Sequence, residues 1–160
     1  MIDKYYSALK SALTPVQAGL TVAWYREQYH NWSEEKAAFL PAILVEFGPL
    51  TMQQQGGGMQ VGTGTVRLHC VTLDRTPSPI SVVSLAQAVF KTLNNKALQE
   101  SDGTAITSAL IRSGISLTNR LPNIKCRVDT YTAEWYDYEG VKVADTVTFG
   151  GLNQVTQVSK

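Results

Sequence analysis

The sequence predicts an α+β fold: a mainly antiparallel sheet with helices packed on one face and a long projecting β-hairpin loop. Apolar residues recur at helical spacing in 2–13 and again in 80–93, which predicts two amphipathic helices. Apolar and polar residues alternate over 59–73 and 124–138, which predicts long strands. A glycine-rich stretch between two strand-like runs predicts the hairpin.

Size and charge narrow the class of protein. The 160 residues fit one domain, which we expect to span 1–150, with a flexible C-terminal tail at 151–160. A formal net charge of +1 gives no basic surplus for nucleic-acid binding. No apolar window approaches the roughly 18 residues of a membrane-spanning helix, and the first residues lack the pattern of a secretion signal. We therefore expect a protein made in the cytoplasm, without a membrane anchor.

The first half of the chain is expected to hold a helix and two strands. The helix over 2–13 closes at Thr14-Pro15, and 22–25 indicates a short strand or an irregular aromatic segment. The β-branched run 42–47 predicts a buried strand that ends at Gly48-Pro49.

The glycine-rich stretch 53–58 is the most distinctive feature of the sequence. Three consecutive glycines carry high backbone entropy, so we expect neither helix nor strand there. With the return strand at 59–73, this predicts a flexible hairpin loop of about a dozen residues, a length that is usually functional or disordered.

The second half is expected to begin with a capped helix. Ser78 is the predicted capping residue and Pro79 the first helical position of the helix over 80–93. A polar connection is expected at 97–103, and 106–111 is ambiguous between helix and strand. Further strands are expected at 113–117, 124–138 and 143–149.

Reactive side chains lack the spacing of any known centre, so we expect no catalytic residue, cofactor or metal. Cys70, Cys126, His30 and His69 are too few and too scattered for a zinc site, and the cysteines are expected to be reduced core residues. His69 and Cys70 are adjacent in a predicted strand, so they point to opposite faces. The glycine-rich stretch lacks the lysine and the following helix of a phosphate-binding loop, and no Gly-x-Ser-x-Gly motif occurs.

Aromatic residues and charges indicate contact surfaces instead. Alternation places Tyr131 and Trp135 on one strand face and Tyr136 and Tyr138 on the other, and one of these faces is a candidate subunit contact, with core packing as the alternative. Residues 91–127 hold six basic and two acidic residues, whereas residues 128–145 hold one basic and five acidic residues. If folding keeps these blocks apart, complementary flanks favour head-to-tail contacts between copies.

The order of elements resembles the tail terminator (tail completion, or tail-to-head joining) proteins of long-tailed bacteriophages and prophages. The matching features are the N-terminal helix, the strand at 41–49, the long loop with its return strand at 61–73, the helix at 80–93, the strand at 124–138 and a closing strand. The resemblance implies a small α+β subunit of the virion that forms a hexameric ring. The ring would cap the tail tube, stop its polymerisation and present a surface to the head connector.

Together these interpretations predict a non-enzymatic assembly protein whose partners are copies of itself, the tail tube protein and the head connector. The expected assembly loop is Gln55, Gly56, Gly57, Gly58, Met59 and Gln60, which would become ordered on assembly. The expected subunit contacts are Arg67, Lys125, Arg127, Glu134, Trp135 and Asp137. One alternative is another neck or tail tube component. The other is a small α+β enzyme or ligand-binding module with a pocket lined by Trp24, Tyr29, Tyr131 and Trp135 beside His30 or an acid.

Overall fold

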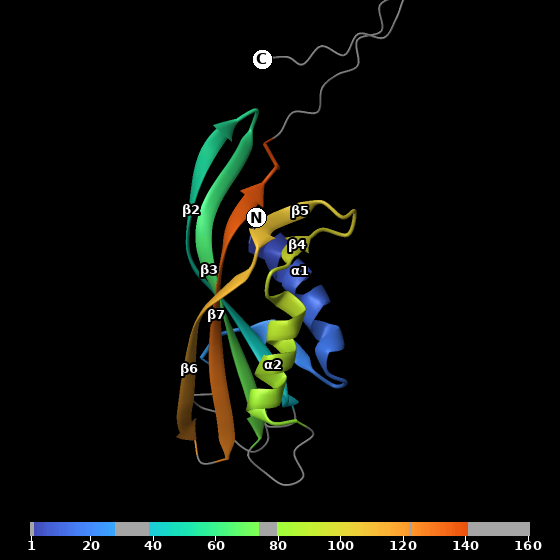
Figure 1. Ribbon diagram of the computed structural model, residues 1–160, viewed down its shortest axis with the longest axis vertical. Helices are drawn as coiled ribbons and strands as arrows, with labels where there is room; N and C mark the ends of the chain where they lie inside the picture. Colours follow the sequence, from blue (N-terminus) through green and yellow to red (C-terminus); the bar gives the residue numbers. More distant parts are fainter. Residues whose placement is uncertain (1, 28–38, 74–79, 122, 141–160) are drawn as a thin grey trace, which may run out of the picture.

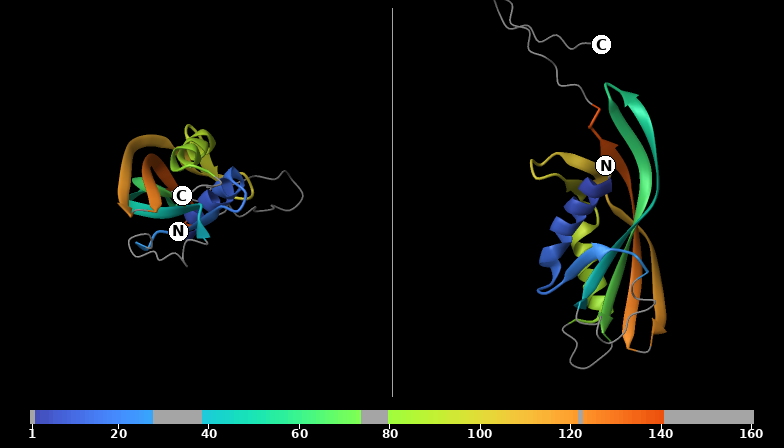
Figure 2. Two further views of the ribbon diagram at one scale, coloured as in Figure 1. Left: turned by 90° about the horizontal axis from the view of Figure 1, so that it is seen from below. Right: turned by 180° about the vertical axis from the view of Figure 1, so that it is seen from behind.

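The predicted fold class is confirmed by a computed structural model, which describes residues 2–27, 39–73, 80–121 and 123–140. In these ranges two helices, α1 (Ile2–Leu13) and α2 (Val82–Leu93), lie on the same side of a long, curled sheet (Figures 1 and 2). A short 3-10 helix, η1 (Thr14–Val16), follows α1 directly. The predicted closing strand at 143–149 and the tail at 151–160 lie outside the described residues, as does the C-terminal boundary of the predicted domain.

The sheet is mainly antiparallel, as expected. Its strands are β1 (Thr21–Trp24), β2 (Ala42–Gly56), β3 (Met59–Leu73), β4 (Ala97–Gln99), β5 (Ala105–Ala109), β6 (Ile111–Leu121) and β7 (Ile124–Asp137). They are ordered β1-β2-β3-β7-β5-β4, and β6 pairs with the first part of β7. Among the described pairs of strands, β1 and β2 alone run parallel.

Helix α1 covers the sheet with one apolar stripe. Tyr5, Leu9 and Leu13 recur every four residues and are fully buried. Asp3 in the first turn and Lys10 in the last turn have the signs that the helix dipole favours. The Tyr5 hydroxyl donates a hydrogen bond to the carbonyl of Tyr136 (2.8 Å), which ties the helix to β7.

Helix α2 begins later than the sequence predicted, at Val82. The capping residue is Ser81 and not Ser78, because Ser81 has an extended backbone and its Oγ accepts the N–H of Ser84 (3.1 Å). The apolar stripe is as expected, and its buried members are Leu85, Ala86, Val89 and Leu93.

Two apolar clusters cover opposite faces of the lower sheet. The larger lies under the helices and includes Tyr5, Leu68, Tyr131 and Trp135. The smaller lies on the other face and consists of Ala42, Leu44, Val71, Ile124, Cys126 and Val128. Burial on both faces explains why 42–45 is apolar without alternation.

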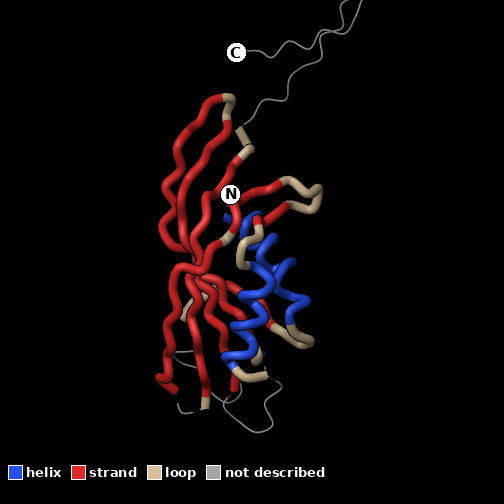
Figure 3. The backbone as a smooth tube through the Cα atoms, in the orientation of Figure 1, coloured by secondary structure: helices blue, strands red, loops and turns tan. Residues whose placement is uncertain are grey.

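The prediction of a long flexible loop at 53–58 was wrong, as was the end of the first strand at Gly48-Pro49. Strand β2 continues to Gly56, and a register shift between Phe47 and Leu50 accommodates Gly48 and Pro49. Proline is tolerated there because β1 pairs with β2 only as far as Val45, so this part of β2 is an edge among the described strands. The two strands are joined by a tight turn at Gly57-Gly58 (Figure 3).

Two other segments also differ from the prediction. The expected polar connection at 97–103 contains the short strand β4, which pairs with β5. The ambiguous run 106–111 is extended, because Ile106 and Leu110 fill the core beneath α1 and α2.

Candidate assembly surface

The outer part of the hairpin, residues 50–64, pairs with residues 133–137 of β7. We call these two segments the arm, whose tip extends beyond the helices (Figure 1). Its tip needs glycine, because Gly56, Gly57 and Gly58 have φ values of 98°, 61° and 86°. Of the predicted assembly loop, Gln55, Gly56 and Gly57 are exposed, whereas Gly58, Met59 and Gln60 are partly buried. The residues chosen from the sequence therefore form a tight turn with its flanking strand ends.

The edge of the arm is open and uncharged. No charged residue occurs from Phe47 to Val66. The Tyr25 N–H donates to the Val45 carbonyl (2.9 Å), and beyond this point no described strand pairs with the outer side of β2. Natural sheet edges are usually protected by charge or covered. The part of this edge beyond Pro49 lacks both forms of protection within the described chain.

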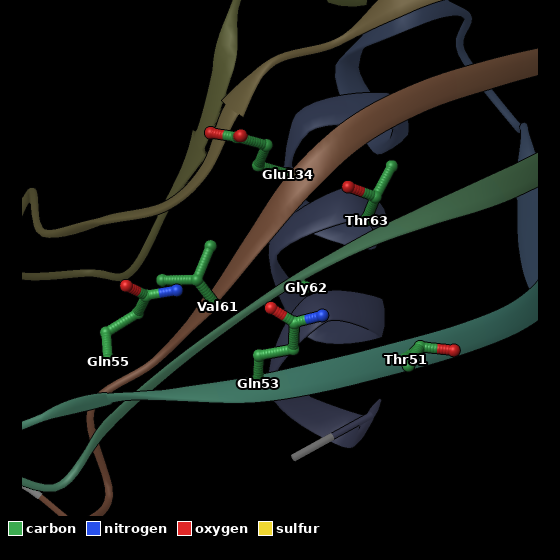
Figure 4. Close-up of a pocket in the computed structure, with 7 residues that line it drawn as sticks. All are labelled: Thr51, Gln53, Gln55, Val61, Gly62, Thr63 and Glu134. Carbon is green, nitrogen blue, oxygen red and sulfur yellow. The ribbon is translucent and has the colours of Figure 1, made fainter.

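A shallow polar concavity lies on the arm (Figure 4). Trp135 packs toward the helices, so the neighbouring Glu134 points to the opposite face, where the register aligns it with Thr63 and Thr51. The concavity has a volume of about 300 Å³ and is lined by Thr51, Gln53, Gln55, Val61, Gly62, Thr63 and Glu134. Its amide, hydroxyl and carboxylate groups are suited to hydrogen bonds with a polar or cationic partner surface.

Glu134, a predicted contact residue, is held in place within this surface. Its backbone N–H donates to Ser108 Oγ (2.9 Å), and the Tyr136 hydroxyl donates to Glu134 Oε2 (3.3 Å). The carboxylate remains exposed. Glu134 therefore lies on an accessible face of β7, and strands β3 and β2 lie between it and the open edge.

Arg67 lies lower on the same face, in a cluster that the sequence did not predict. Its Nη1 is 3.3 Å from Glu46 Oε1, and Glu46 Oε2 is 3.0 Å from His69 Nε2. The ring of Tyr25 stacks on His69 with centroids 4.0 Å apart. The Arg67 side chain is still 52% exposed, so it remains accessible to a partner.

Arg127, another predicted contact residue, is partly buried and engaged in an ion pair within the chain. It donates from Nε to Asp129 Oδ1 (2.7 Å), and Arg112 Nη1 lies 3.1 Å from Asp129 Oδ2. Asp129 is fully buried, and its hydrogen bond raises the pKa of Arg127. If the Arg127 side chain turned to a partner subunit, the buried Asp129 carboxylate would lose one of its two arginine partners, which would destabilise the fold.

Trp135 is also a core residue and not an exposed contact. It is 1% exposed and packs edge-to-face on Tyr5, with centroids 4.8 Å apart. The predicted separation of aromatic faces is confirmed, because Tyr131 and Trp135 lie in the helix-side cluster and Tyr136 packs near Tyr138 on the other side. Core packing, the alternative, therefore accounts for Tyr131 and Trp135.

Asp137 is likewise committed within the chain. Its Oδ1 accepts hydrogen bonds from Lys4 Nζ (2.9 Å) and from the Glu139 N–H (3.1 Å). Burial alone would raise the pKa of this carboxyl, but the Lys4 ammonium and the Glu139 N–H outweigh burial and hold the pKa below its ordinary value. Asp137 thus joins α1 to the upper end of β7.

Lys125 and Glu134 lie nine residues apart on β7, about 30 Å at a strand's rise of roughly 3.4 Å per residue. The predicted basic and acidic blocks are therefore separated at these two positions. The side chains that sequence reasoning missed are Thr51, Gln53 and Thr63. A pattern in the sequence could have indicated this polar face, because Thr51, Gln53 and Gln55 alternate with Leu50 and Met52 at the period of a strand.

The described residues offer little reactive chemistry. Cys70 and Cys126 are buried free thiols, and burial raises the pKa of the Cys70 thiol, which disfavours the nucleophilic thiolate. No group of three His, Cys, Asp or Glu side chains within the described ranges is placed to hold a metal ion. None of the helices in these ranges is long and apolar enough to span a membrane.

The alternative aromatic ligand pocket is not formed as predicted. Tyr131 and Trp135 are buried under the helices, and Trp24 stacks on Tyr6 with centroids 4.4 Å apart. Tyr29 and His30 lie outside the described residues. Two of the four expected walls are therefore part of the core.

Comparison with known proteins gives likenesses among solved structures and no match among protein families or curated proteins. No protein-family model matches the chain, and no curated protein matches it. A chain of the solved structure titled "Virion of native gene transfer agent (GTA) particle" is similar with a TM-score of 0.49 and 14% identity, over 85% of this chain and 97% of that chain. A TM-score and identity this low assign no function to this chain.

Proposed function

We propose that this chain is a structural subunit of a phage-type virion that assembles with copies of itself into a ring at the head–tail joint. The observation that carries the proposal is the arm, which presents an open uncharged edge and, on the face of the sheet opposite the helices, a polar concavity (Figure 4). The resemblance of the element order to tail terminator proteins supports the same role. Both helices, the long hairpin and the long strand β7 of that order are present.

In this role the protein acts by the shape of its edges when copies meet. The arm of each subunit contacts the next, and the exposed Arg67 and Glu134 are the predicted contact residues that remain accessible. The ring, which we expect to be a hexamer, caps the tail tube protein and presents its other side to the head connector. Catalysis, nucleic-acid readout, a cofactor and a membrane are not part of the mechanism.

The first experiment measures self-assembly of the intact chain. Light scattering after size exclusion and native mass spectrometry, over a series of concentrations, should show a closed oligomer with a single stoichiometry, and electron microscopy should show rings. A chain that stays monomeric at its highest soluble concentration, and does not bind the ends of purified tail tubes, contradicts the proposal. Binding along the whole tube, rather than at its end, would favour a tube component instead.

A deletion of Gly56–Gly58 tests the arm directly. We expect this variant to fold, because the two clusters lie elsewhere, but to lose ring formation and tail–head joining. The matched control deletes Ser101–Gly103 from the exposed turn between β4 and β5, which also holds a glycine with positive φ. Normal rings from the tip deletion would count against a role of the arm.

A further inference from the structure

Within the described residues, the outer part of strand β2 has one unpaired edge. From Leu50 to Gly56 the strand pairs with β3 on one side, and no described residue pairs with its other side. An exposed strand edge presents unpaired N–H and C=O groups, which an added strand satisfies. Leu50 and Met52 are partly buried on the helix side, whereas Thr51, Gln53 and Gln55 are exposed on the other. A strand that pairs with this edge should therefore be apolar on the helix side and polar on the other side.

The C-terminal segment of the chain matches this requirement in sequence. Twenty residues follow Gly140, a length of up to about 66 Å when extended. They start beside the tip of the arm, because a Cβ on Gly140 would lie against the carbonyl oxygen of Gly58. Residues 143–149 have the sequence Val-Ala-Asp-Thr-Val-Thr-Phe. Val143, Asp145, Val147 and Phe149 alternate with Ala144, Thr146 and Thr148, so one face is apolar except at Asp145 and the other is small or polar.

We propose that residues 143–149 of a neighbouring copy add to the outer edge of β2 as an antiparallel strand. The proposal rests on the self-assembly proposed above and identifies the contact that joins the copies. In the register that matches the faces, Phe149 lies opposite Leu50 and Val147 opposite Met52. Thr148 then lies opposite Thr51 and Thr146 opposite Gln53, so polar residues extend the concave face.

Chain length favours a neighbour's edge over the chain's own edge. To pair with its own β2 with Val143 opposite Gly56, as the full register requires, the chain must pass from Gly140, beside Gly58 at the start of β3, to a position beyond β2, two strand spacings or about 10 Å away. It must also reverse its direction. Three peptide units span at most about 10 Å when fully extended, which leaves no residue for the reversal. A neighbouring copy imposes neither requirement.

Cysteine cross-linking between copies tests the pairing in the intact chain. Opposite residues of paired strands have Cβ atoms close enough for a disulfide, and the native Cys70 and Cys126 are buried. Met52→Cys protein is mixed with Val147→Cys protein and mildly oxidised. We expect a covalent heterodimer on a non-reducing gel, at least tenfold more than from a mixture of Met52→Cys with the control Thr156→Cys.

The outcomes separate this inference from the proposed function. A double variant, Met52→Cys/Val147→Cys, that closes within one chain while the mixture stays uncross-linked overturns the inference, as does no cross-link in either sample. If the wild-type chain nevertheless forms rings, the proposed function stands and the copies join elsewhere. A second variant, Val147→Pro, should weaken ring formation at least tenfold, whereas Val155→Pro should not. Unchanged rings from Val147→Pro contradict the inference.

Discussion

The same three strands behave differently in the lower sheet and in the arm. In the lower sheet, β2, β3 and β7 are covered on both faces by apolar clusters. In the arm they are apolar on the helix side only, and the other face is a polar concavity with an open edge beside it. The lower sheet is therefore specified by side-chain packing, and the arm by backbone pairing and by glycine.

Glycine supports the arm through close approach as well as through the turn. A Cβ at Gly62 would lie against the Thr51 carbonyl oxygen, and one at Gly64 would lie 2.8 Å from Leu50 Cδ1 and 3.0 Å from Trp135 Nε1. These two glycines let the neighbouring strands pack against β3 without bulky side chains between them. The arm can thus hold its shape while its outer face stays free for a partner.

The largest effect on folding is expected in the lower sheet, from Asp129→Ala. The substitution leaves Arg112 and Arg127 without their shared buried carboxylate, so we expect a loss of about 3–5 kcal/mol in the free energy of unfolding. Urea denaturation followed by tryptophan fluorescence measures it. The control Glu134→Ala, on the exposed face of the arm, should change stability by less than about 0.5 kcal/mol. Equal effects of the two variants would contradict the distinction between the regions.

A smaller effect is expected in the arm, from Gly62→Ala. The new methyl group would meet backbone and side-chain atoms of β2, including Met52 Sδ at 2.6 Å, so the strands must separate. We expect a loss of about 1–3 kcal/mol, measured by thermal and urea unfolding.

The matched control for this substitution is Gly114→Ala in the edge strand β6. A Cβ there would make an ordinary contact of 3.7 Å with Thr130, so stability should change by less than about 0.5 kcal/mol. A Gly62→Ala variant as stable as Gly114→Ala would mean that the arm tolerates a wider spacing between its strands.

The sequence predicted the packed elements well because packing leaves a periodic pattern. Tyr5, Leu9 and Leu13 mark α1, and the alternation in 59–73 predicts β3 with its observed bounds. The arm was misjudged because three glycines suggest flexibility, whereas positive φ in a two-residue turn is what a tight hairpin requires.

Contact residues were harder to predict than strands, because burial depends on partners far away in the chain. Trp135 is buried by Tyr5, and Asp137 is paired with Lys4, 133 residues before it. The sequence of β7 by itself does not indicate either contact. Glu134, between these two residues, is exposed because alternation turns it away from α1.

The smallest expected effect concerns the link between α1 and the arm, in Lys4→Met. Lys4 and Asp137 are both partly shielded, so losing their ion pair should cost about 1 kcal/mol at neutral pH.

Because the folded state holds the pKa of Asp137 below its ordinary value of 3.8, this carboxylate stabilises the fold above that pH. Its contribution is lost as the pH falls through the lowered folded-state pKa. Wild-type stability should therefore fall more steeply below about pH 4 than that of Lys4→Met, whereas Lys10→Met, exposed on the same helix, should follow the wild type. Parallel acid profiles for wild type and Lys4→Met would show that the Lys4–Asp137 pair adds no stability and that Tyr5 holds the upper end of β7 without it.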